Sequence, residues 1–321
     1  MKLVLLFATL CGVKGNDWYS FQKFIKTHDK FYDTHKEFLN RFSIFSSNLR
    51  IIEYNNMQNK NFKLSINKFT DMTSNELFYG FKSSDNMLSQ TRSCNEFKDF
   101  KTSDLPDFVD WRDSAVTPVK DQGQCGSCWS FSATGAMEGA WAISTGDLVS
   151  LSEQQLLDCS IRYGDMACKG GLMDNAFEYA IDYGMCLEND VPYEAERESC
   201  KLTNCETKVK FSECQDVPSG NQLALKAAVA QQPVSVAIQA DKFVFQSYSS
   251  GVITGDSCGT NLDHGVLIVG YGTENEVDYW LVKNSWGDSW GDNGYVKIGR
   301  NDTVNNLGVC GIATTPSFPV V

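Results

Sequence analysis

The stretch that decides the fold is Gln-Gly-Gln-Cys-Gly-Ser-Cys-Trp, residues 122–129, at the entrance to an apolar, alanine-rich segment. Residues 128–145 carry Trp, Phe, Ala and Met side chains and stop at Gly146, which predicts a buried helix closed by a glycine. Cys128 therefore opens a helix, where free backbone N–H groups and the positive end of the helix dipole face its sulfur. That position favours the thiolate, which is the nucleophilic form of cysteine.

The chain has three histidines, and one of them is the candidate partner of this cysteine. His28 and His35 lie in the N-terminal third, whereas His264 lies downstream in Leu-Asp-His-Gly-Val, before an apolar, β-branched run that predicts a strand. An imidazole can accept and deliver a proton near neutral pH. We therefore assign His264 as the acid–base candidate for Cys128.

Two amide side chains complete the candidate site. Asn284, in Lys-Asn-Ser-Trp-Gly, follows the next apolar strand and can accept the ring N–H of His264. Trp286 is placed to shield that hydrogen bond from water, which would strengthen it. Gln122 offers an amide N–H that can form an oxyanion hole with the backbone N–H of Cys128.

Each of these residues also has a structural interpretation. Cys128 could be a core residue of an apolar helix, or could form half of a zinc site with Cys125, although no second half is found. His264 could be a core histidine, Asn284 a turn residue, and Gln122 a loop amide. The occurrence of all of them together favours the catalytic interpretation.

The three segments, in this order, resemble those of papain-family cysteine peptidases, and the resemblance covers nearly the whole chain. It implies that Cys128 is the nucleophile, His264 the acid–base group, Asn284 its orienting residue and Gln122 the oxyanion donor. It also implies an α+β, two-lobed papain-like fold, with a helical left lobe and a β-barrel-like right lobe, that hydrolyses peptide bonds through an acyl-enzyme. Neither a cofactor nor a metal is expected.

The order of elements agrees with that fold class, because a helical half precedes a β half. Beyond the helix at 128–145, a capping pattern at 152–155 and the segment 172–183 before Gly184 predict two more helices. Four Val-, Ile- and Tyr-rich runs predict strands at 234–239, 265–271, 278–283 and 294–299.

The N-terminal region, which reads as helical over 17–60, resembles the propeptides of cathepsin L-type zymogens. Six residues match the helical pattern of those propeptides: Glu37, Arg41, Phe45, Asn48, Ile52 and Asn56. Three match a second motif, Asn67, Phe69 and Asp71, in which Ser65 replaces a glycine. The resemblance implies that this segment lies through the cleft as an intramolecular inhibitor.

The domain boundaries follow from composition and from that resemblance. Residues 1–15 combine a lysine, a short apolar run and small residues, which is typical of a signal peptide cut after Cys11 or Gly15. We predict a propeptide over 16–104 and a peptidase domain over 105–321. Polar residues 83–100 predict a linker or a loosely held strand, and a region open to cleavage.

The net charge of the chain limits the classes of binding partner that we expect. The formal charge is −12, so nucleic acid is not expected as a partner. Residues 1–104 hold 15 Lys and Arg against 11 Asp and Glu, a net of +4, whereas the rest hold 13 against 29, a net of −16. Acid weakens attraction between such parts by protonating carboxylates, so we expect activation at acid pH. Protein and peptide substrates, no membrane and a monomer are expected.

Twelve cysteines predict an oxidising compartment, and the chain is expected in the secretory pathway, in a lysosome or vacuole or outside the cell. The resemblance implies three disulfides, Cys125–Cys168, Cys159–Cys200 and Cys258–Cys310, with Cys186–Cys205 as a possible fourth. Cys214 is then expected to be a free buried thiol. Asn301-Asp-Thr is an N-glycosylation triplet that is used only if exposed.

The resemblance also assigns substrate-binding residues. They surround the nucleophile in the family: Gly170, Gly171, Leu172, Met173, Ala237, Leu262, Asp263, Gly265, Trp286 and Thr315. The S2 pocket would be apolar and prefer Leu, Val or Phe at P2, and no occluding loop is seen, which implies an endopeptidase. The alternatives are a catalytically silent binding protein of the same fold, or a protease inhibitor acting through residues 16–104.

Overall fold

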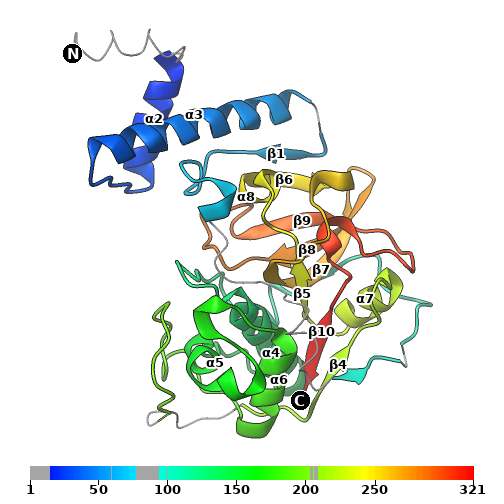
Figure 1. Cartoon of the computed structure of the whole chain (residues 1–321). Coiled ribbons are helices and arrows are strands. Elements are labelled where there is room, and N and C mark those ends of the chain that lie inside the picture. The colour runs from blue at the N-terminus through cyan, green and yellow to red at the C-terminus, as the bar shows by residue number, and fades with distance from the viewer. Residues whose placement is uncertain (1–14, 59, 77–93, 99, 203–204, 206–208) are drawn as a thin grey trace.

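The computed structural model describes residues 15–58, 60–76, 94–98, 100–202, 205 and 209–321 (Figure 1). The expected signal peptide over 1–15 lies outside the described residues apart from Gly15, as does most of the expected linker over 83–100. Within the described part, no helix combines the length and apolar character needed to cross a membrane.

The N-terminal helical domain, residues 15–76, forms its own small unit above the rest of the molecule in Figure 1. Helices α2 (Gly15–Thr27) and α3 (His35–Met57) pack through a core of Phe21, Phe24, Phe45 and Leu49. The domain continues through β1 (Phe62–Leu64) and the 3-10 turn η1 (Ser74–Glu76). Its two helices confirm the helical prediction for this region.

The body, residues 105–321, begins with the helical lobe, whose three predicted helices are confirmed. They are α4 (Cys128–Thr145), α5 (Glu153–Cys159) and α6 (Met173–Tyr183). Gly146 ends α4 with a φ of 80°, a conformation that glycine adopts without strain. The short 3-10 turns η2 (Ser160–Tyr163) and η3 (Ala167–Lys169) lie between α5 and α6.

The β lobe contains the four predicted strands, close to their expected bounds. They are β5 (Val234–Ile238), β7 (His264–Glu274), β8 (Val277–Lys283) and β9 (Tyr295–Gly299). The sequence did not reveal β1, β3 (Val109–Asp110), β4 (Glu213–Asp216), β6 (Tyr248–Ile253), β10 (Ser317–Val320), α7 (Gln222–Val229), α8 (Phe243–Gln246), η4 (Gly255–Ser257) and η5 (Val309–Gly311). Most of these are too short to show a hydrophobic period.

One sheet joins the two units. Among the described residues its strand order is β1-β6-β9-β8-β7-β5-β10-β4-β2, with β3 paired to β7. Strand β1 is antiparallel to β6, and β2 (Asn95–Glu96) is parallel to β4. The N-terminal region thus supplies the strand at each end of the sheet.

Five disulfides occur among the described residues. The pairs Cys125–Cys168, Cys159–Cys200, Cys258–Cys310 and Cys186–Cys205 agree with expectation. The prediction of a free Cys214 is wrong, because Cys214 is bonded to Cys94. The prediction paired only cysteines within residues 105–321, whereas β2 brings Cys94 beside β4. The free cysteine that remains in the described part is Cys128, which is buried.

Candidate active site

Four of the candidate residues meet in one cavity between the helical lobe and the β lobe, and Asn284 adjoins it through its hydrogen bond to His264. Helix α4 begins at Cys128, and β7 begins at His264. Both residues line a cavity of about 340 Å³, together with Gln122 and Trp286. The N-terminal helical domain lines the same cavity through His28, Lys30, Lys68, Phe69, Met72 and Glu76.

Cys128 lies at the first turn of α4 and is buried. The backbone N–H of Gly265, the neighbour of His264, donates to its Sγ at 3.3 Å. Burial nevertheless raises the pKa of the Cys128 thiol to about 12, because the charged thiolate loses hydration. Burial thus acts against the stabilisation of the thiolate that the sequence predicts from the helix N-terminus.

His264 is held by Asn284 and covered by Trp286. Nε2 of His264 and Oδ1 of Asn284 are 2.7 Å apart, and the amide oxygen makes the imidazole nitrogen the donor. The Trp286 ring stacks on the imidazole with centroids 4.8 Å apart and planes at 30°. This bond leaves Nδ1 as the ring nitrogen available to a reactant in the cavity.

Burial also sets the protonation state of this histidine. It lowers the pKa of His264 to about 4, with the Asn284 hydrogen bond acting in the opposite direction. Burial therefore disfavours the charged forms of both His264 and Cys128.

Gln122 is placed by both of its amide atoms. Its Nε2 donates to the carbonyl oxygen of Cys125 at 3.0 Å, and its Oε1 accepts from the Ser285 hydroxyl at 2.6 Å. An amide nitrogen carries two hydrogens, so one N–H remains for an oxyanion in the cavity. The backbone of Gln122 is fixed as well, because its N–H donates to the Ser285 carbonyl at 2.8 Å.

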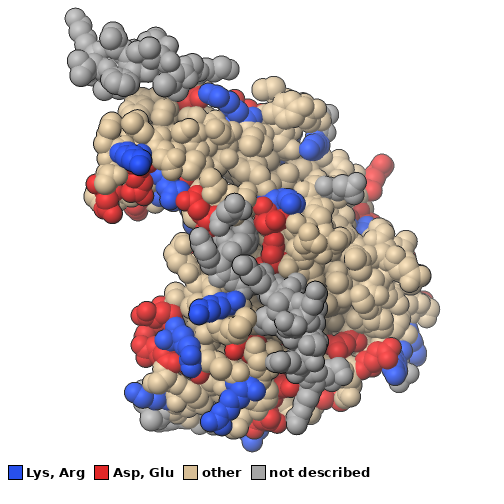
Figure 2. Space-filling view, viewed as in Figure 1, with Lys and Arg blue, Asp and Glu red and all other residues tan. Residues whose placement is uncertain are grey.

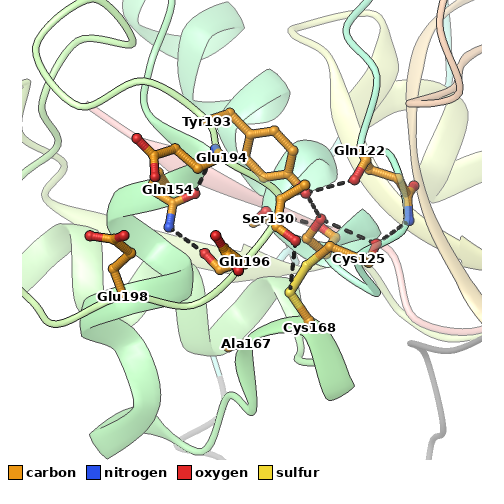
Figure 3. Close-up of a disulfide and its surroundings, with 12 residues drawn as sticks. Gln122, Cys125, Ser130, Gln154, Ala167, Cys168, Tyr193, Glu194, Glu196 and Glu198 are labelled. Atoms are coloured by element: carbon orange, nitrogen blue, oxygen red, sulfur yellow. Dashed lines mark hydrogen bonds between the residues drawn. A yellow bond between two sulfur atoms is a disulfide. The ribbon is translucent and has the colours of Figure 1, made fainter.

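Tyr193 is a supporting residue that sequence reasoning missed. Its hydroxyl donates to the Gln122 carbonyl at 2.8 Å (Figure 3). The same hydroxyl lies 2.5 Å from the hydroxyl of Ser127, the N-cap of α4. The Cys125–Cys168 disulfide lies beside this group and ties the loop before α4 to η3. No motif marks Tyr193, since its role depends on a fold that brings distant segments together.

The second N-terminal motif contacts the body next to the cavity. The Asn67 side-chain amide donates to the Gln246 carbonyl at 2.7 Å, and its Oδ1 accepts from the Phe69 N–H at 3.0 Å. The Phe69 ring packs edge-on against Trp286, with centroids 5.2 Å apart. At the position where the motif has glycine, Ser65 donates its N–H to the Ser247 carbonyl at 2.8 Å.

Residues of the first motif, above all Arg41, Asn48 and Asn56, connect α3 to the segment that makes these contacts. Asn48 donates to the carbonyls of Thr70 and Met72, and Asn56 pairs with both backbone groups of Leu64. Arg41 binds the Asp71 carbonyl and the Glu76 carboxylate. Phe45 and Ile52 are buried, and the Glu37 N–H is capped by Thr34. The pattern therefore encodes the attachment of residues 62–76 to α3.

The predicted substrate-binding residues are only partly assembled around the cavity. Asp263 and Trp286 line it. The others divide into buried and accessible groups: Gly170, Gly171, Leu172, Met173, Ala237 and Gly265 are buried, Leu262 is half-buried, and Thr315 is exposed. A Cβ on Gly171 would meet the Trp129 ring at 2.5 Å, so this position requires glycine. Their assignment as a substrate pocket remains a prediction.

Charge is distributed less simply than the sequence totals suggest. Lys and Arg side chains are interspersed with Asp and Glu on both units of the face shown in Figure 2. One ion pair crosses between the units at the cavity, from Lys68 to Asp121 at 2.5 Å. Other pairs, such as Lys30–Asp71 and Arg41–Glu76, lie within the N-terminal helical domain.

Asn301 of the glycosylation triplet is exposed. Its Oδ1 accepts hydrogen bonds from Gln222 and from the Thr303 hydroxyl. Accessibility meets the first requirement for modification, and glycan attachment there remains a prediction.

Comparison with known proteins adds an independent line of evidence. Residues 105–320 match the model of the papain family cysteine protease, and residues 21–77 match the cathepsin propeptide inhibitor domain. The chain is 47% identical to germination-specific cysteine protease 1 of Arabidopsis thaliana, over 87% of this chain and 77% of that protein. It is 44% identical to the senescence-specific cysteine protease SAG39 of Oryza sativa subsp. indica, over 93% and 88% of the two chains.

Solved structures resemble the whole chain. The proform of the ragweed pollen allergen cysteine protease Amb a 11 superposes with a TM-score of 0.87 at 39% identity, covering 97% of this chain and 95% of that one. Digestive procathepsin L 3 of Tenebrio molitor gives 0.84 at 40% identity, covering 96% and 100%. Both are precursor forms, which agrees with a helical domain seated on a two-lobed body.

Proposed function

Because the chain belongs to the papain family of cysteine proteases and carries a cathepsin propeptide inhibitor domain, we propose that it is an endopeptidase whose catalytic group is Cys128, His264 and Asn284. The observation that carries the proposal is the shared cavity of Cys128 and His264, in which Asn284 fixes the imidazole. Neither a silent peptidase fold nor an isolated inhibitor is favoured, because the four candidate residues and both domains are present.

The proposed reaction proceeds in two steps. His264 takes the proton of the Cys128 thiol as the sulfur attacks the peptide carbonyl carbon, and the carbonyl oxygen takes the negative charge while facing the Gln122 amide and the Cys128 N–H. His264 delivers a proton to the leaving amine, the C–N bond breaks, and an acyl-enzyme forms. Water then attacks the acyl carbon, gives a proton to His264, and releases the carboxylic acid and the thiolate.

The proform is chemically resting in this scheme. Burial favours the thiol of Cys128 and the neutral imidazole of His264, as described above. Removal of the N-terminal helical domain would hydrate both groups, and the penalty on their charged forms would fall. Inhibition then has an electrostatic part in addition to steric blockage of the cavity.

Acid activation follows from groups of the N-terminal helical domain. Burial and the nearby charge of Lys30 lower the pKa of His28, which lines the cavity. A histidine kept neutral while the N-terminal helical domain is docked (the closed form) favours detachment of that domain (the open form) as the pH falls below the ordinary pKa of histidine. The reason is that the open form binds the proton more tightly. Glu76 acts in the same direction at lower pH, because, although burial opposes ionisation, hydrogen bonds from Thr73 and Arg41 hold its pKa below the ordinary value in the closed form.

Specificity is proposed to come from the apolar residues beside the cleft. Leu172, Met173 and Ala237 belong to a buried cluster that spans the helical lobe and the β lobe, and Leu262 packs against that cluster. An S2 subsite built from them would favour Leu, Val or Phe at P2, because it offers no carboxylate to an arginine. Five disulfides support the proposed secretory route, to a vacuole, a lysosome or the outside of the cell.

The test replaces the nucleophile. Cys128→Ala, processed in trans by wild-type enzyme that is then removed, should hydrolyse a Leu-Arg fluorogenic peptide on the order of 10³-fold more slowly or worse. Ile143→Ala, on an exposed part of the same helix, should keep the wild-type rate. Activity of Cys128→Ala close to wild type would refute the assignment. If the wild-type enzyme cleaved a matching Arg-Arg peptide as fast as the Leu-Arg peptide, only the proposal of an apolar S2 subsite would be refuted.

A further inference from the structure

The Cys94–Cys214 disulfide crosses the expected maturation site. Cys94 lies before residue 105, outside both matched domains, whereas Cys214 lies in β4 within the protease domain. Both cysteines are buried. Cleavage near Leu105 cuts the chain between them but leaves the covalent bond intact.

The segment around Cys94 is docked by more than its sulfur. Asn95 and Glu96 form β2 in parallel register with Gln215 and Asp216 of β4. The Phe97 N–H donates to the Asp216 carbonyl at 2.8 Å. We call residues Cys94–Phe97 the strap.

The strap also contributes to the core of the body. Phe97 is buried and packs edge-on against Phe318 of β10, with centroids 5.3 Å apart. The Asn95 side chain donates to the Glu213 carboxylate at 2.9 Å. In Figure 1, β4 and β10 lie at the opposite end of the molecule from α2 and α3, so the strap is remote from the helical domain.

The chain immediately after the strap suits a protease. Residues Lys101–Asp104 are all exposed, whereas Leu105 packs against the core and Val109 is buried in β3. Exposed stretches between docked segments are preferred cleavage sites. A cut there separates two docked segments without unfolding either.

A metal site at this position does not fit. The carboxyl groups of Asp174 and Asp216 and the Cys94 sulfur lie within 4.8 Å of one another. The disulfide, however, withholds the thiolate that a metal would need.

We infer that processing leaves the strap covalently attached, so that the active enzyme is a two-chain molecule whose sheet keeps β2 as its edge strand. This inference rests on the proposed function, because it assumes proteolytic maturation near Leu105. It has a further consequence, since release of the N-terminal helical domain then requires a second cut on the N-terminal side of Cys94.

The test is intact mass spectrometry of the full chain after acid processing, without and with reductant. We expect one species without reductant and two with it: the protease domain, and a peptide that contains Cys94 and ends before residue 105. A bare protease domain without reductant, or a single chain that begins before Cys94, would overturn the inference.

Two variants test the attachment of the strap independently of the proposed catalytic residues. Cys128→Ala, cut by added pepsin in the exposed stretch after the strap, should release a peptide that contains Cys94 only after reduction, so the disulfide is read even if the proposed nucleophile is wrong. Cys94→Ser, processed in the same way, should lose the peptide without reductant and expose one thiol at Cys214 to alkylation. If a Cys94→Ser chain does not fold, the reduced and unreduced wild-type masses still decide.

Discussion

The N-terminal region extends the sheet of the body at both ends, and the two ends are attached by different means. At one end β1 pairs with β6 through a short antiparallel ladder, supported by Asn67, by Phe69 and by the Lys68–Asp121 ion pair. At the other end β2 pairs with β4 beside a disulfide. The β1 end borders the cavity that contains Cys128, and the β2 end does not.

This difference separates two tasks that one propeptide performs. Hydrogen bonds, ring contacts and an exposed ion pair each contribute modestly, and the ion pair is weakened further by salt, so the inhibitory end can dissociate. A disulfide is a covalent bond that salt does not weaken. The molecule thus combines a removable inhibitor with a retained edge strand, and variants at each end should have distinct effects.

The largest effect is expected from the core of the helical domain. Phe45→Ala removes a fully buried ring that packs against Phe21 and Phe24, with centroids 5.2 and 5.0 Å apart. Such truncations cost about 3–5 kcal/mol, which is a large part of the stability of so small a domain. The proform should then hydrolyse peptides at pH 7 without acid treatment, and its first thermal transition should fall.

Leu39→Ala is the matched control, because Leu39 lies on the same helix and is about half exposed. It should remain latent. A Phe45→Ala proform as latent as the wild type would mean that the β1 end docks independently of the helical core, and the comparison between the two ends would need revision.

The second-largest effect is expected from a substitution in β6 that disturbs its pairing with β1. Gly251 in β6 has a φ of 79°, and a Cβ there would meet the Asn61 carbonyl oxygen at 2.2 Å. Gly251→Ala should therefore push β1 away and speed self-processing at pH 6, on the order of 10-fold, since close backbone approach is possible only for glycine. The rate is followed by the loss of the precursor band.

Gly255→Ala supplies the control for conformational strain. Gly255 has a similar φ of 66°, but no atom lies within 4 Å of its added Cβ. Both variants should destabilise the body to a similar extent, and Gly251→Ala alone should affect latency. Equal acceleration in both would attribute the effect to the body and not to the β1 contact.

Features that are determined by local sequence patterns were predicted correctly. The helix that begins at Cys128, the strand that begins at His264, and the position of Asn284 after a strand were predicted because long periodic segments and local caps determine them. The pairing of Asn284 with His264 agrees with the geometry. These features depend on order along the chain.

Features that depend on meetings between distant segments were not predicted. Strand β2 has two residues and no period, so its pairing with β4, and with it the Cys94–Cys214 bond, could not be inferred. The effect of burial on Cys128 was not predicted for a related reason. Burial raises the pKa of the thiol, and no local sequence pattern reports on that desolvation.

A smaller effect is expected from Glu76, whose carboxylate ties η1 to α3. Burial opposes ionisation, but hydrogen bonds from Thr73 and Arg41 hold the pKa of Glu76 below its ordinary value. Its stabilising contribution is complete above that ordinary value and is lost as the pH falls through the lowered pKa. Glu76→Gln should raise processing several-fold at pH 6 and flatten the acid limb of the pH–rate profile.

Glu53→Gln, at an exposed position of α3, should leave that profile unchanged. A Glu76→Gln profile that keeps the wild-type slope below pH 5 would remove Glu76 from the acid response. The disulfide-linked strap should be retained in both variants, because its attachment does not titrate.

The smallest effect on processing is expected from His28. Its distinguishing feature is the direction in which the processing rate changes with pH. Burial first, and then the charge of Lys30, lower the pKa of His28 in the closed form. Once the helical domain detaches, the ring regains its ordinary value, so the open form binds more protons as the pH falls below about 6.5, and the closed form loses stability there. His28→Gln should therefore slow processing at pH 5 by a factor of about 2 and leave the rate at pH 7 unchanged.

His35→Gln, at an exposed position, controls for loss of a histidine. A slowing of equal size at both pH values would assign His28 a contact role, and the acid response of the β1 end would then rest on carboxylates such as Glu76.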